Sequence, residues 1–187
     1  MTHFTVVLIL FSVYTLFVVV GAVSMLTAKR RKFLPLLVFG YVLLSVFVFF
    51  EGMGFFRTPA FVLGLVFLCV LLHTLVGEHL AVYHKSTTFD RWLHLTGTFT
   101  FALFVNSIID NTIKPPPLPK AYLFVFVAAL GTALGSAFEV FEYFHDKATQ
   151  HKPRLPTQHG LKDTDTDMLF NIVGAALAGL VAVFVYA

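Results

Sequence analysis

Residues 3–26 read HFTVVLILFSVYTLFVVVGAVSML, an apolar run whose only ionisable groups are a histidine and a tyrosine. A helix needs roughly 20 apolar residues to cross about 30 Å of hydrocarbon. The 187 residues are 58% hydrophobic and 12% charged, against about 25% charged in soluble domains. We therefore expect an all-α, polytopic membrane protein, with six transmembrane helices in one bundle and one domain over 1–187. The expected spans are 3–26, 33–50, 60–80, 93–113, 121–144 and 168–187.

Charge and cysteine usage exclude other classes. The first run lacks a basic segment before it and is too long for a signal peptide, so we expect an uncleaved span. Cys69 is the only cysteine and forms no internal disulfide. The net charge of +3 comes from basic residues gathered in a few loops. We expect the lipid bilayer as partner and no nucleic acid.

The lysines and arginines predict the orientation. Ten of them fall in the loops after the first, third and fifth spans, and three fall in the two other loops. Because cytoplasmic loops carry the excess of basic residues, both termini are expected outside. The long segment 145–167 is then a cytoplasmic loop.

Two stretches around the third loop carry ionisable groups. HTLVGEH, residues 73–79, holds His73 inside the apolar run, followed by Glu78 and His79. Ionisable residues inside spans are candidates for function, although a histidine can simply bond to a neighbouring helix. FDRWLH, residues 89–94, places Asp90 and His94 four residues apart on one helical face. An aspartate that orients a histidine is common beside metals; a helix-start aspartate near an interfacial histidine is the alternative.

The fifth span ends in GTALGSAFEVFEYFHD, residues 131–146. Gly131 and Gly135 form a pair typical of close helix packing. Glu139 and Glu142 follow on one helical stripe, and like charges so close are tolerable only if they are protonated, hydrated or bound to cations. This pair is the strongest local indication of a functional site.

The segment LKDTDTDMLFNIVGA, residues 161–175, holds three alternating aspartates. It is not an EF-hand, because the sixth and twelfth positions counted from Asp163 are methionine and glycine. Thr166 or Asp167 could cap a helix that starts at residue 168, which explains only part of the pattern. Asp167 and Asn171 lie on one face, and small residues after them favour packing against the fifth span. Whether Asp163 or Asp165 joins the site stays open.

These stretches also resemble the YjdF-like family of small prokaryotic inner-membrane proteins, over residues 73–187, and more distantly VanZ-like proteins. The resemblance implies a multi-pass protein of the prokaryotic plasma membrane with no established chemistry. His159 departs from the family's pattern. The positions that the resemblance carries over are Asp90, His94, Glu139, Glu142, Gln158, Asp163, Asp167 and Asn171.

Three functions compete. The first is a metal-dependent enzyme, a hydrolase or another lipid-modifying enzyme, that acts on a lipid or amphiphile from the cytoplasmic side. Its Mn, Fe or Zn ion would be held by Glu139, Glu142, Asp163 or Asp165, and Asp167. His73 and His94 would be ligands or acid–base groups, and Asp90 would orient His94. The second is a small transporter of cations or protons, and the third is a scaffold of ion pairs through Lys85, Arg91 and Lys162. Small-residue faces also permit a homo-oligomer.

Overall fold

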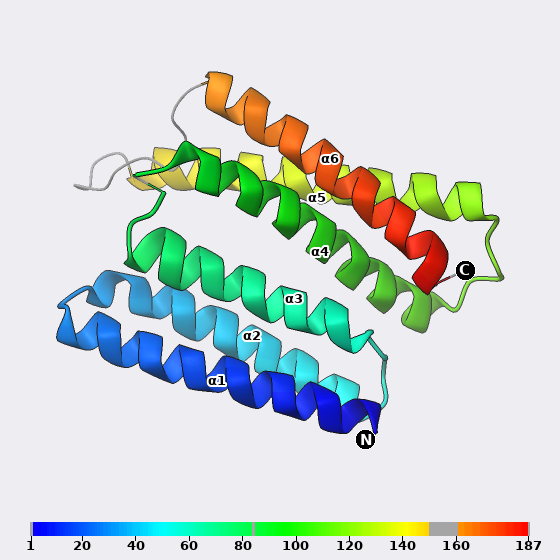
Figure 1. Ribbon diagram of the computed structural model, residues 1–187, viewed down its shortest axis with the longest axis horizontal. Helices are drawn as coiled ribbons and strands as arrows, with labels where there is room; N and C mark the ends of the chain where they lie inside the picture. Colours follow the sequence, from blue (N-terminus) through cyan, green and yellow to red (C-terminus); the bar gives the residue numbers. More distant parts are fainter. Residues whose placement is uncertain (1, 84, 150–160, 187) are drawn as a thin grey trace. The chain divides into compact units, whose positions relative to one another are not determined.

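The computed structural model describes residues 2–83, 85–149 and 161–186, and confirms an all-helical protein (Figure 1). Six helices in these ranges are long and apolar enough to cross a membrane. The elements are α1 (His3–Thr27), the short 3-10 turn η1 (Arg31–Phe33), α2 (Leu34–Gly52), α3 (Ala60–Leu71), the π-helix η2 (Leu72–His79), α4 (Thr87–Ile113), α5 (Lys120–Thr149) and α6 (Leu161–Val185).

The chain divides into two compact units, which are described separately. The first unit comprises Met1–Val82 and Ser107–Lys114, and the second comprises Tyr83–Asn106 and Pro115–Ala187. Helix α4 therefore contributes its last turns to the first unit and the rest to the second. The expectation of a single domain stays a prediction, as does the expectation of outside termini.

In the first unit, α1, α2 and α3 lie side by side (Figure 1). Their apolar faces meet through stacked aromatic rings, among them Tyr14 and Phe67 with centroids 4.8 Å apart. Two polar pairs join elements far apart in sequence. The carboxylate of Glu51 at the end of α2 lies 2.8 Å from His3 Nε2, and the His79 ring lies 2.9 Å from the Ser24 hydroxyl.

In the second unit, α4, α5 and α6 approach closely because small residues face one another. A Cβ added at Gly131 of α5 would lie 2.8 Å from Ala175 Cβ of α6 and 3.0 Å from Ala102 Cβ of α4. One added at Gly174 of α6 would collide with the backbone carbonyl of Leu95. The expected packing of the small-residue faces is confirmed.

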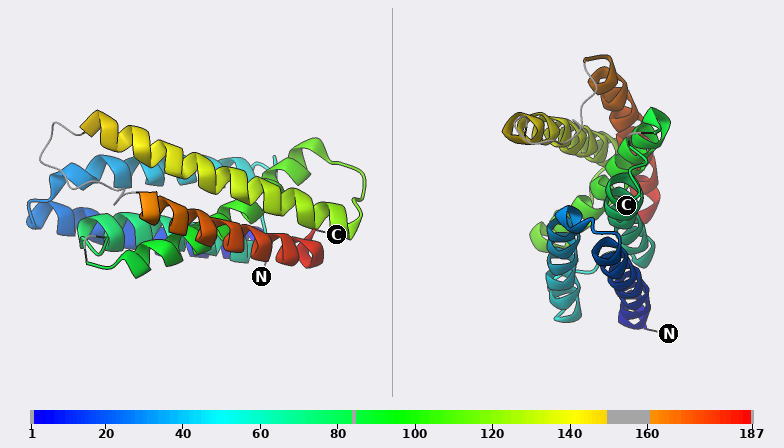
Figure 2. Two further views of the ribbon diagram at one scale, coloured as in Figure 1. Left: turned by 90° about the horizontal axis from the view of Figure 1, so that it is seen from above. Right: turned by 90° about the vertical axis from the view of Figure 1, so that its left-hand side faces the viewer.

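The start of α6 differs from the expected span at 168. The helix begins at Leu161, so the aspartates belong to its first turns, and the Thr166 hydroxyl donates to the Lys162 carbonyl within the helix. Neither Thr166 nor Asp167 therefore caps this helix, because both lie inside it. Hydropathy marks only the part of a helix that lies in lipid, and a polar extension beyond it resembles a loop. The last turns of α5 and the first turns of α6 diverge in Figure 1 and in the right view of Figure 2.

Candidate metal centre

The first turns of α4 present an acid and a histidine to the interior of the second unit. Asp90 and His94 are separated by one helical turn, and Asp90 Oδ1 lies 3.7 Å from His94 Nε2. The His94 side chain is only 4% exposed, and the Asp90 side chain is 16% exposed. The ring of His94 also packs against Phe138 of α5, with centroids 5.6 Å apart. Its direction is therefore fixed by packing as well as by charge.

Helix α5 brings a second acid to the same ring nitrogen. Glu139 Oε1 lies 3.4 Å from His94 Nε2, and the Glu139 side chain is 6% exposed. Glu142, one turn further along α5, is close enough to complete a group with Glu139 and His94. One imidazole nitrogen thus faces carboxylates from two helices.

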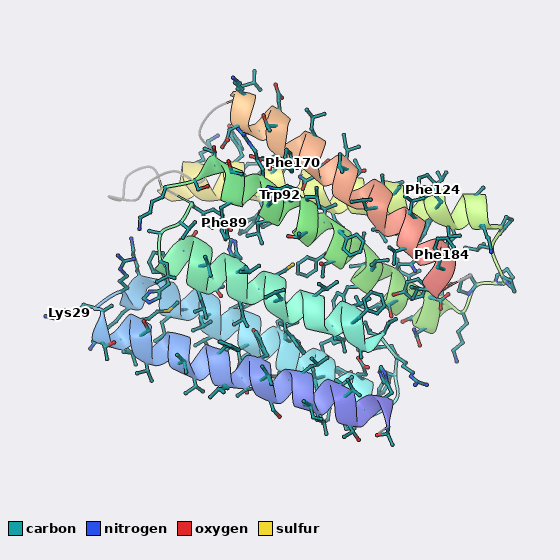
Figure 3. All side chains as sticks on the ribbon, in the orientation of Figure 1. Lys29, Phe89, Trp92, Phe124, Phe170 and Phe184 are labelled. Atoms are coloured by element: carbon teal, nitrogen blue, oxygen red, sulfur yellow. The ribbon has the colours of Figure 1, made fainter. Side chains whose placement is uncertain are left out.

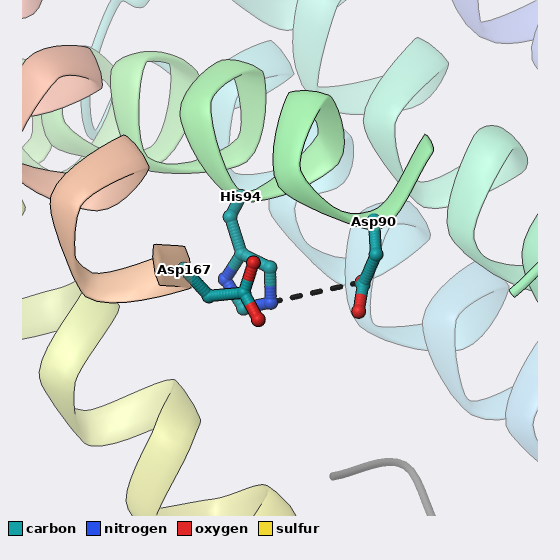
Figure 4. A group of neighbouring side chains, drawn as sticks. All are labelled: Asp90, His94 and Asp167. Atoms are coloured by element: carbon teal, nitrogen blue, oxygen red, sulfur yellow. Dashed lines mark ion pairs between the residues drawn. The ribbon is translucent and has the colours of Figure 1, made fainter. Parts of the chain in front are cut away.

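Helix α6 supplies the third side of the site. Asp167 points toward His94 and Asp90, as Figure 4 shows, and is 3% exposed. One turn further, Asn171 is fully buried, and its Oδ1 accepts a hydrogen bond of 2.7 Å from the Thr98 hydroxyl of α4. The bond ties α6 to α4 directly below the acids. At the rim, Trp92 of α4 meets Phe170 of α6 edge to face (Figure 3).

Because α6 begins at Leu161, the structure distinguishes between Asp163 and Asp165, between which the sequence alone could not choose. Asp163 lies one turn before Asp167 and is half-buried, whereas Asp165 is exposed. The charge of Asp163 acts on both Asp90 and Asp167. Among the described residues, Asp163 therefore lies at the edge of the site, and Asp165 lies outside both groups of possible ligands.

The geometry suits a cation. Two groups of side chains could each hold a metal ion: Asp90, His94 and Asp167, or His94, Glu139 and Glu142, with ligand atoms within 4.8 Å of one another. Ligands about 2.0–2.2 Å from a metal are themselves roughly 3–4 Å apart. The two distances at His94 Nε2 fall in this range, so small side-chain movements would close either group around an ion.

Buried polar atoms at this site that lack a hydrogen-bond partner among the described residues include Asp167 Oδ1, Asn171 Nδ2 and Arg91 Nε. A buried polar atom without a partner costs about 1–3 kcal/mol, and a native protein tolerates this mainly where a ligand or water completes the bond. The chemistry of the donors fits as well. Histidine and carboxylate ligands without thiolates suit Mn, Fe or Zn.

Other candidate residues lie elsewhere. His73, Glu78 and His79 belong to the first unit, inside the π-helix η2. Such helices are frequent at functional sites, but the His79 ring is engaged by Ser24 and its carbonyl accepts from Arg30. The roles of these three residues stay predictions. Gln158 lies outside the described residues.

Sequence reasoning missed Thr98. The residue lies one turn beyond His94 and two turns beyond Asp90, so helical periodicity alone would have placed it on the same stripe. A hydroxyl inside a span usually bonds to the backbone of its own helix, so the sequence alone does not indicate that Thr98 bonds to another helix.

The fold and the site together define a multi-pass helical membrane protein with a buried cluster of one histidine and several carboxylates. The chain belongs to the family described as "Predicted membrane protein (DUF2238)", whose model matches residues 6–187. An "Uncharacterized protein" of Thermotoga maritima is 33% identical over 106 residues, which are 56% of this chain and 53% of that protein. The chain thus spans about half the length of this prokaryotic relative. No solved structure matches the chain. The finer likeness to the YjdF-like and VanZ-like proteins stays a prediction.

Proposed function

We propose that the protein is a membrane-embedded metalloprotein whose His94-centred site binds a divalent Mn, Fe or Zn ion. The bound metal would serve an enzyme that acts on a lipid or another amphiphile. One observation carries the proposal: α4, α5 and α6 each direct an acid toward the buried ring of His94, and the acids from α5 and α6, Glu139 and Asp167, are themselves buried. Without a cation, carboxylates so close repel one another and pay the full cost of desolvation.

A scaffold of ion pairs explains less of the site. Arg91 is the basic residue whose charge acts on Asp90 and Asp167. One guanidinium cannot balance the acids of both groups, whereas a divalent ion at either group would be bound by side chains from two helices.

The position of the site favours an amphiphilic substrate. Asp90 lies in the first turn of α4, Asp167 in the second turn of α6, and Glu139 near the end of the apolar part of α5. All three positions fall at the same end of their spans, which the basic loops predict to be cytoplasmic. A lipid presents its polar head group at this depth, so its ester or phosphoryl oxygens could reach the metal while its chains stay in the bilayer.

The chemistry follows from this arrangement. A bound divalent ion would supply Lewis acidity and a more acidic bound water. The ion would be held by His94 with Glu139 and Glu142, or by His94 with Asp90 and Asp167. Where Asp90 is not a ligand, it would orient the His94 ring as a ligand or as an acid–base group. The Nε–H of Arg91 and the amide of Asn171 are the buried donors available to an oxygen of the substrate.

Metal analysis of the purified protein tests the proposal. The full chain in detergent, stripped with a chelator and then dialysed against Mn²⁺, should retain metal, and Glu139→Gln should bind it at least about 10-fold more weakly, the low end of effects seen for outer-shell ligand partners. Glu51→Gln is the matched control, because Glu51 is also a buried carboxylate that pairs with a histidine but lies in the first unit. Wild-type protein that binds no Mn²⁺, Fe²⁺ or Zn²⁺ would refute the proposal.

A second candidate function, transport of a cation or proton, draws on another observation. Helix α4 carries further buried polar residues between His94 and the far end of the helix, namely Thr98, Thr100, Asn106 and Ser107. Polar groups along a span are expected of a transport path. Proteoliposomes loaded with a Mn²⁺-sensitive or pH-sensitive dye discriminate between the two, because a transporter dissipates an imposed gradient and a metalloenzyme leaves it intact.

A further inference from the structure

We infer that the site holds two divalent ions rather than one, in a carboxylate-bridged pair. The first position is formed by His94, Glu139 and Glu142, and the second by Asp90 and Asp167, with Asp163 at its edge. The inference rests on the proposed metal function and adds a second ion, a distinct ligand chemistry and a stoichiometry.

The geometry assigns His94 to the first position. Both groups of possible ligands contain His94, but one ring nitrogen binds only one ion. His94 Nε2 lies 3.4 Å from Glu139 Oε1 and 3.7 Å from Asp90 Oδ1, so the nearer partner is on α5. Once His94 serves the α5 position, Asp90 and Asp167 remain as a separate pair of oxygen ligands on α4 and α6.

The charge of the site requires more than one ion. Among the residues that the structure describes, the site holds five carboxylates, those of Asp90, Glu139, Glu142, Asp163 and Asp167, together with the guanidinium of Arg91. When the acids are ionised, four negative charges remain, of which one divalent ion cancels half and two divalent ions cancel all. Buried net charge is strongly unfavourable. The site therefore favours two divalent ions, because they reduce its net charge to zero.

An independent observation points to a ligand at the second position. Asp167 is 3% exposed, and its Oδ1 has no hydrogen-bond partner among the described residues. Figure 4 shows this carboxylate turned toward His94 and Asp90 rather than toward its own helix. A buried and unpartnered oxygen aimed into a cluster of acids is stabilised by a cation and destabilised without one.

Asp90 is the natural bridge between the two positions. The ligand atoms of Asp90, His94 and Asp167 all lie within 4.8 Å of one another, so Asp90 reaches both His94 of the first position and Asp167 of the second. Bridged ions lie about 3.5–4 Å apart in two-metal sites, where they clamp both the attacking and the leaving oxygen of a substrate. The second position has oxygen ligands alone and suits Mg²⁺ or Mn²⁺, whereas the first has a nitrogen ligand and suits Mn²⁺, Fe²⁺ or Zn²⁺.

The test is the Mn²⁺ stoichiometry of the full chain in detergent, without an affinity tag, together with its electron paramagnetic resonance spectrum. Wild-type protein should bind two Mn²⁺ per chain and show the spectrum of an exchange-coupled pair. Asp167→Asn and Glu142→Gln should each bind one Mn²⁺ and show an uncoupled six-line signal. Glu51→Gln should behave as wild type.

The outcomes separate the two proposals. One Mn²⁺ per saturated wild-type chain, or two ions without coupling, overturns the pair and leaves the proposed metal function standing. No bound Mn²⁺, Fe²⁺ or Zn²⁺ overturns both. Because wild-type protein alone decides between these results, a variant that fails to fold does not prevent a decision.

Discussion

Replacing Gly135 with alanine should weaken metal binding without touching a ligand. The new Cβ would lie 2.6 Å from Asn171 Cγ and 2.8 Å from Asn171 Cβ. Carbon atoms in ordinary contact are about 3.5–4.0 Å apart, so the atoms must separate by roughly 1 Å. A change of the Asn171 rotamer cannot provide this, because the Cβ moves only with the backbone. Helix α6 must therefore shift away from α5.

The shift reaches the site through Asp167, which lies one turn before Asn171 on α6. Metal–ligand distances tolerate only about 0.2 Å of deviation, so a movement of roughly 1 Å exceeds the tolerance several times. Loss of supporting contacts around a metal typically lowers affinity about 10–100-fold. We expect the Mn²⁺ affinity of Gly135→Ala, measured by equilibrium dialysis, to fall within that range.

Gly97→Ala is the matched control. Gly97 also lies inside a helix of the second unit, and a Cβ there meets nothing within 4 Å. This variant should keep the wild-type affinity and gain up to about 1 kcal/mol of helix propensity. Equal affinities for the two variants, with both folded by circular dichroism and monodisperse in detergent, would refute the transmission of strain from Gly135 to Asp167.

Four further results are expected. Thr98→Val removes the donor to Asn171 Oδ1 and should lower the free energy of unfolding by about 1–3 kcal/mol in a detergent-denaturation titration, whereas Thr98→Ser should restore most of it. Gly174→Ala places its Cβ against the Leu95 carbonyl, which cannot rotate away, and should cost about 1–3 kcal/mol in the same assay. Chelation should lower the unfolding temperature, since an ion at 100 times its Kd stabilises the folded state by about 2.7 kcal/mol. Metal affinity should decrease as the pH is lowered, because His94 and the acids take up protons. A melting temperature that EDTA leaves unchanged at every pH would contradict both the expected effect of chelation and the expected effect of pH.

Hydropathy and residue spacing predicted much of this structure. Six apolar runs became six helices, and the small residues of α5 and α6 meet as their spacing indicated. The grouping of Asp90, His94, Glu139, Glu142 and Asp167 followed from helical periodicity together with the end of the span at which each lies. Hydropathy and residue spacing are local properties of the sequence, and a regular helix converts residue spacing directly into positions on one face.

Two features depended on contacts that no local pattern encodes. The start of α6 was placed too late, because a polar helical turn outside the apolar run has the composition of a loop, and the choice between Asp163 and Asp165 stayed open for the same reason. The partner of Thr98 could not be deduced, since the helix that it meets is far away in sequence.

The division of the site among α4, α5 and α6 has a consequence for the order of biogenesis. Segments of a chain fold in the order in which they are synthesised. Helix α5, with Glu139 and Glu142, therefore enters the membrane before α6, with Asp167 and Asn171. Insertion of α6 is then the step at which the proposed ligand set becomes complete. In the proposed metal function, an ion would bind only after all six helices have entered the membrane.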